Sequence, residues 1–176
     1  MSMYILLEVL QTFGISIAIG SSTFALIFYY KSIRDGAIDA SEKSFLHTVY
    51  TVLRIGMGMI IITQLLFVVW HYQYGSMEAF VSSSFWMMWT ILAVIIANAT
   101  LMQLHLMPMM IGPAIAGGSW YTFAIVDTLK AYELPYLSWL GYYVLFIIAF
   151  ALFLRLVKIM YVDHYQQALK RASEQA

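Results

Sequence analysis

The sequence predicts an all-α integral membrane protein, built as a bundle of five transmembrane helices. The chain is 62% hydrophobic and only 10% charged, whereas about a quarter of the residues in soluble domains are charged. Its apolar residues also gather in five long stretches, each close to or above the roughly 20 residues that a helix needs to cross the bilayer core. These stretches lack a two-residue alternation, so helices rather than the strands of a β-barrel are expected.

The five predicted spans cover residues 3–30, 45–70, 79–106, 109–126 and 137–161, and residues 162–176 form a tail. Together they make one transmembrane domain over residues 1–176. The first stretch lacks a basic start and a cleavage site, so we expect it to remain as a helix. The glycines and prolines of the fourth span favour one of two interpretations. Its first half is kinked or re-entrant, or its small residues allow close helix packing, through pairs such as Gly112 with Ala116 and Ala114 with Gly118.

The basic residues gather on one side of the predicted membrane. They occupy the connector after the first span and the segment around the end of the last, at Lys31, Arg34, Lys43, Arg155, Lys158, Lys170 and Arg171. Only Lys130 falls on the opposite side. Because short cytoplasmic loops are enriched in Lys and Arg, we expect an outside N-terminus and a cytoplasmic C-terminus, in a plasma or inner membrane.

Composition also narrows the chemistry and the partners. The chain contains no cysteine, which excludes disulfides, thiolate metal ligands and dithiol redox chemistry. A formal net charge of zero gives no reason to expect nucleic acid as a partner. The expected partner is the lipid bilayer, and a homo-oligomer or a larger membrane complex remains open.

The connector before the second span contains a recognisable helix start. Asp39 followed by Glu42 matches a capping box, after a turn at Asp35 and Gly36. The same segment resembles the second half of a calcium-binding EF loop, but Lys31 and Ile33 stand where the first two carboxylates belong. A helix cap is therefore the preferred interpretation.

Polar residues inside the spans carry the functional argument, because each is costly in lipid. The second span holds His47, Tyr50 and Arg54, and the third holds Asn98 and His105. His47 and Arg54 are seven residues apart, as are Asn98 and His105, so each pair shares a helix face. Since the two helices run antiparallel, the histidines fall at one depth and Arg54 and Asn98 about 10 Å deeper.

This arrangement predicts a small membrane protein that binds haem or a transition metal, for electron transfer or metal handling. His47 and His105 are the expected ligands, with Arg54 available for a haem propionate and Tyr50 and Asn98 as contacts. The thioethers of Met102 and Met109 add soft ligands that favour Cu(I), so haem b and copper are the candidate cofactors. We also expect Arg54 to be buried against protein or ligand, because a mid-leaflet charge costs at least roughly 2.5 kcal/mol.

Two alternatives remain open. The first is a transporter or channel component with its fourth helix and Arg54 lining the route. The second is a non-catalytic packing subunit of a membrane complex. Glu8, Asp127 and Glu133 lie toward the outer side, either lining an access path for a cation or acting as hydrated helix ends. No nucleophile motif, phosphate-binding loop or zinc-hydrolase signature is present, so an enzymatic activity is left undecided.

Overall fold

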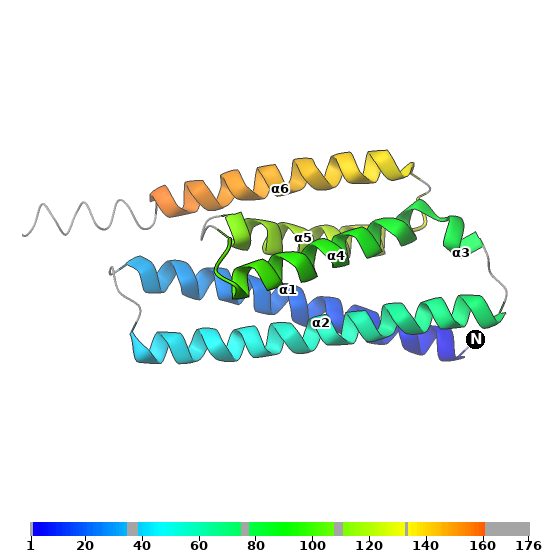
Figure 1. Cartoon of the computed structure of the whole chain (residues 1–176), viewed down its shortest axis with the longest axis horizontal. Helices are drawn as coiled ribbons and strands as arrows, with labels where there is room; N and C mark the ends of the chain where they lie inside the picture. Colours follow the sequence, from blue (N-terminus) through cyan, green and yellow to red (C-terminus); the bar gives the residue numbers. More distant parts are fainter. Residues whose placement is uncertain (1, 35–38, 75–77, 108–110, 133, 161–176) are drawn as a thin grey trace, which may run out of the picture.

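The computed structural model describes residues 2–34, 39–74, 78–107, 111–132 and 134–160. Five long helices lie side by side in one elongated bundle (Figure 1): α1 (Ser2–Arg34), α2 (Ala40–Tyr74), α4 (Ser83–Gln103), α5 (Ile111–Thr128) and α6 (Tyr136–Lys158). A four-residue helix, α3 (Glu78–Val81), precedes α4. The described residues contain no strand, so the prediction of an all-helical protein is confirmed.

Four of the helices are long and apolar enough to cross a membrane, as expected of a multi-pass membrane protein. These candidate spans are Met3–Lys31, Ala40–Tyr74, Ser83–Gln103 and Tyr136–Lys158. The fifth long helix, α5, is not among these candidate spans and lies among the others, in contact with α1, α4 and α6. Half of its 18 residues are buried within the bundle. A helix that packs mainly on protein needs less apolar surface than one that faces lipid.

The helix bounds differ from the predicted spans in two places. The structure interrupts the predicted 79–106 stretch at Ser82, whose backbone is extended with φ −63° and ψ 128°. The same stretch ends earlier than predicted because His105 adopts a left-handed backbone, with φ 56°. Its N–H bonds to the carbonyl of Met102, and the N–H of Leu106 bonds to that of Leu101. These two bonds make a Schellman motif, which terminates α4.

The glycines and prolines at the start of α5 do not break it within the described residues. The helix is continuous from Ile111 to Thr128, and Pro113 falls in its first turn, where no intrahelical N–H is needed. Of the two interpretations of this segment, the structure agrees with close packing of its small residues. A Cβ at Gly112 would lie 2.9 Å from Met102 of α4, and one at Gly118 would lie 3.2 Å from Ile147 of α6.

The closest helix contact joins α1 to α2. A Cβ at Gly56 of α2 would lie 3.0 Å from the backbone N of Ala18 and 3.1 Å from the carbonyl O of Gly14. Ala18 is fully buried, and Ile60 of α2, also fully buried, lies beside Gly14. Small residues therefore let the two backbones approach, which is how helices gain contact when lipid supplies no hydrophobic driving force.

The helix cap at the start of α2 is confirmed. The N–H of Glu42 donates to Oδ1 of Asp39 at 2.7 Å, and the N–H of Asp39 donates to Oε2 of Glu42 at 3.1 Å. These reciprocal bonds form a capping box. The predicted turn at Asp35 and Gly36 lies outside the described residues.

The α1–α2 contact makes a matched pair of glycine substitutions informative. We expect Gly56→Ala to destabilise the protein by about 1–3 kcal/mol, because its methyl group would press on backbone atoms that cannot rotate away. Gly20→Ala is the control, since a Cβ there meets nothing within 4 Å and alanine favours a helix by up to about 1 kcal/mol. Thermal unfolding in detergent measures both, and a Gly56→Ala protein as stable as the Gly20→Ala protein would contradict the tight contact.

Candidate functional site: a polar groove between α1 and α5

A charged and polar cluster joins α1 to the C-terminal end of α5. Nε2 of Gln11 donates to Oδ1 of Asp127 at 2.6 Å, and Nζ of Lys130 donates to Oε1 of Glu8 at 3.0 Å. The ammonium of Lys130 also lies 3.5 Å from Oδ1 of Asp127. Two carboxylates therefore share one ammonium group, and the cluster keeps a net negative charge.

Polar contacts lead from this cluster into the middle of the bundle. Nε2 of Gln64 on α2 donates to Oε1 of Gln11 at 3.3 Å and lies 3.6 Å from Sδ of Met88 on α4. Gln64 is 1% exposed and Gln11 is 2% exposed. A polar chain thus runs from Lys130 at the bundle end through Asp127 and Gln11 to a fully enclosed amide.

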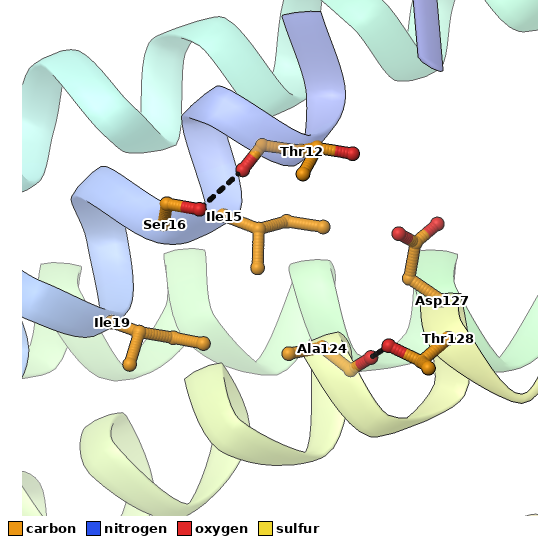
Figure 2. Close-up of a pocket in the computed structure, with 7 residues that line it drawn as sticks. All are labelled: Thr12, Ile15, Ser16, Ile19, Ala124, Asp127 and Thr128. Carbon is orange, nitrogen blue, oxygen red and sulfur yellow. Dashed lines mark hydrogen bonds between the residues drawn. The ribbon is translucent and has the colours of Figure 1, made fainter. Parts of the chain in front are cut away.

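A groove of about 340 Å³ opens beside Asp127, between α1 and α5. Its lining residues are Thr12, Ile15, Ser16, Ile19, Ala124, Asp127 and Thr128. Figure 2 shows the hydroxyl side chains of α1 on one wall, and the carboxylate of Asp127 with the hydroxyl of Thr128 on the facing wall. The groove therefore offers oxygen atoms from two helices around one space.

The hydroxyl groups of the groove already donate to their own helices. The side chains of Thr12, Ser16 and Thr128 each donate to the carbonyl oxygen four residues earlier, at 2.8–2.9 Å. A hydroxyl oxygen that has donated its proton still carries lone pairs that accept or coordinate. These groups consequently act toward the groove as electron-pair donors, alongside the Asp127 carboxylate.

The cluster holds Lys130 in its charged form. Burial alone lowers the pKa of this ammonium, but the charge of Asp127 and the hydrogen bond to Glu8 outweigh burial and raise the pKa above its ordinary value. The side chain of Asp127 is only 16% exposed, compared with 38% for Lys130 and Glu8. Asp127 is therefore the least hydrated of the three charges and the one nearest the groove.

The predicted ligands His47 and His105 are both exposed, His47 in the first part of α2 and His105 just after the end of α4. Neither imidazole makes a hydrogen bond, ion pair or ring contact with any described residue. The main packing partner of α2 is α1, and that of α4 is α5, so no extensive α2–α4 interface brings the two together. The haem or metal site at these histidines stays a prediction.

Tyr50 and Arg54 are also exposed on α2. The described residues of this chain therefore do not bury Arg54, and its burial against protein or a ligand stays a prediction. The position of Arg54 explains its exposure, because the buried side of α2 is occupied by Gly56, Ile60 and Thr63, which face α1 or the core. An arginine two residues before Gly56 falls on another side of the helix.

Asn98 and Met102 have a structural role in the described fold. Nδ2 of Asn98 donates to the carbonyl of Gly112 at 3.0 Å and lies 3.6 Å from Sδ of Met102. Asn98 is 3% exposed, and its Oδ1 has no hydrogen-bond partner among the described residues. These contacts tie the end of α4 to the start of α5. The other soft-ligand candidate, Met109, lies outside the described residues, as does Glu133.

Sequence reasoning singled out Glu8 and Asp127 as candidates for a cation path but missed the two glutamines that extend the cluster inward. The signal was present, because Gln11 and Gln64 are uncharged polar residues inside long apolar runs. Polar groups at such positions normally face the interior of a bundle. What the sequence does not contain is the α1–α2 register that brings them together.

No protein-family model matches the chain, and comparisons with curated proteins and with solved structures found no match. The functional argument therefore rests on the geometry of the groove and its polar cluster.

A substitution at Gln11 tests how much the buried hydrogen bonds of this cluster contribute to the stability of the protein. We expect Gln11→Leu to destabilise the protein by about 1–3 kcal/mol, because the amide of Gln64 loses its acceptor and Asp127 loses its donor. The neighbouring Thr12→Val is the control, since Thr12 is exposed and bonds only to its own helix, so its loss should cost no more than about 0.5 kcal/mol. Equal melting temperatures for the two variants would argue against a cooperative polar chain.

Proposed function

We propose that this protein is a transporter or channel component whose groove between α1 and α5 binds a cation. The observation that carries this proposal is the Asp127 carboxylate, held by Gln11 and Lys130 beside a 340 Å³ space with hydroxyl groups on both walls. Carboxylate and hydroxyl oxygens suit hard cations and protons. Ionisable residues within membrane segments commonly mark ion or substrate pathways.

The cluster beyond the groove supports the same chemistry. Its net negative charge attracts a cation toward Asp127, while Lys130 lowers the energy of the carboxylate when no cation is bound. A cation that approaches Asp127 competes with this ammonium for the same oxygen. The amides of Gln11 and Gln64 continue the polar surface inward, since each carries an acceptor oxygen as well as donors.

The proposal includes an orientation. Lys31 at the end of α1, Lys43 in α2, and Arg155 and Lys158 in α6 lie at one end of the bundle, opposite the groove cluster. The excess of basic residues in cytoplasmic segments favours an outside N-terminus and an outward-facing groove. In this arrangement α5 is a fifth span, shielded from lipid by α1, α4 and α6, and the membrane is a plasma or inner membrane.

Cation binding can be measured without knowing the natural substrate. We expect one of Na⁺, K⁺ or Ca²⁺ to raise the melting temperature of the purified protein by about 2 °C or more at fixed ionic strength, because a ligand that binds only the folded state stabilises it. Asp127→Asn should abolish the shift. Glu78→Gln is the matched control, since Glu78 is an exposed carboxylate in α3, away from the groove. If no cation shifts the wild-type melting temperature, the groove is not a cation site.

Haem or metal binding remains a second candidate, favoured by the two exposed imidazoles without partners among the described residues. Because no extensive contact between α2 and α4 brings the two imidazoles together, a metal would be bound by His47 or by His105 together with ligands from another source. Electron transfer or metal handling would follow from such a site.

The absorbance spectrum and metal content of detergent-purified protein test this candidate. If it is right, a Soret band or a stoichiometric metal is present, and His47→Ala removes it. His105→Gly should also remove it while stabilising the fold by about 0.4–1 kcal/mol, because glycine accepts the left-handed φ of 56° more readily. A wild-type protein with neither a Soret band nor a bound metal rules the candidate out.

A further inference from the structure

One side of α2 carries a polar stripe that the described residues of this chain leave uncovered. His47, Thr51 and Arg54 follow one another at spacings of four and three residues, and Gly58 comes four residues later, so all four share a face. The first three are exposed, and a Cβ at Gly58 would meet nothing within 4 Å. Among the described residues Arg54 has no hydrogen bond or ion pair.

The packing of α2 on α1 sets the depth of Arg54 in the bundle. Gly56 lies against Ala18, which is the middle residue of α1 (Ser2–Arg34). Arg54 is also ten residues, or about 15 Å, from Gln64 in the groove cluster, and eleven residues, or about 16 Å, from Lys43 at the basic end. Arg54 lies three residues from the centre of the candidate span Ala40–Tyr74, and therefore near the midplane of a membrane that this span crosses.

An exposed guanidinium at that depth needs an anionic or strongly polar partner. Charged residues inside membranes almost always pair with one another or face water, and the headgroups at about 15 Å lie beyond the length of one arginine side chain. We propose that the α2 face around Arg54 binds a transmembrane helix of a different protein that carries a carboxylate in the middle of its span.

A second copy of this chain does not provide that carboxylate. The acidic residues that the structure describes all lie near helix ends, at Glu8, Asp39, Glu42, Glu78 and Asp127. The other four acidic residues fall outside the spans that the sequence predicts. Glu8 and Asp127 are already engaged by Lys130. The partner must therefore be a chain of another sequence.

Gly58 adds a steric reason for a helix as the partner. It lies one turn from Arg54 on the same face, and the absence of a side chain lets a second backbone approach. This face is on α2, whereas the groove lies between α1 and α5. The proposed interface is therefore independent of cation binding in the groove.

Synthetic leucine-rich transmembrane peptides with one central residue test the interface. The donor-labelled protein in phosphatidylcholine vesicles is titrated with acceptor-labelled peptides that carry Glu, Gln or Leu at the centre, and energy transfer is measured. We expect the Glu peptide to bind about tenfold more tightly than the Leu peptide, with the Gln peptide between them. Arg54→Leu should remove this preference, and Arg54→Glu should transfer it to a peptide with central Lys.

Two glycine variants test the face itself. Gly58→Leu should weaken binding of the Glu peptide, whereas Gly141→Leu should not, because Gly141 is equally open but lies on α6. If wild-type protein binds Glu and Leu peptides equally, or if Arg54→Leu keeps the preference, headgroups satisfy Arg54 and the proposal is wrong. Energy transfer between copies of this protein that disappears in Arg54→Leu would also overturn it, in favour of self-association.

Discussion

The contact of Gly56 with the backbone of Gly14 and Ala18 determines much of the remaining structure. It holds α1 and α2 at a separation that no larger residue would allow, and it fixes how far one helix is shifted along the other. That register aligns Gln64 with Gln11. Gln11 in turn reaches Asp127 on α5, so the groove cluster depends on an apolar contact two turns away.

The same register gives the two polar regions of the bundle different depths and different surroundings. The groove cluster lies near one bundle end, where Lys130 compensates part of the charge of two carboxylates and the three groups remain partly hydrated. Arg54 lies near the level of Ala18 and has no partner among the residues that the structure describes. The cluster with its internal ammonium is the basis of the proposed cation site, and the uncompensated charge of Arg54 is the basis of the proposed interface with a second chain.

The all-helical fold was predictable because the backbone of a long apolar stretch must satisfy its own hydrogen bonds in a membrane, which a helix does. The capping box of Asp39 and Glu42 was predictable from the three-residue spacing of these two side chains. The Schellman motif at His105 was not, because no glycine or asparagine marks its left-handed position. The surroundings of Arg54 were not predictable either, because its side chain is exposed in this chain and the sequence does not show what covers it. Periodicity identifies a shared face but does not say which chain covers that face.

The placement of α5 connects composition with function. This helix is not among the four candidate spans, yet it is the long helix most enclosed by protein. Protein neighbours can satisfy hydroxyl groups and a carboxylate that lipid cannot, so a central helix tolerates Ser119, Thr122 and Asp127 where a peripheral helix would be destabilised. Ser119 pairs with the hydroxyl of Tyr143 on α6, and Thr122 with its own backbone. Asp127 extends from this satisfied interior to the groove, which is why the proposed cation binding centres on its carboxylate.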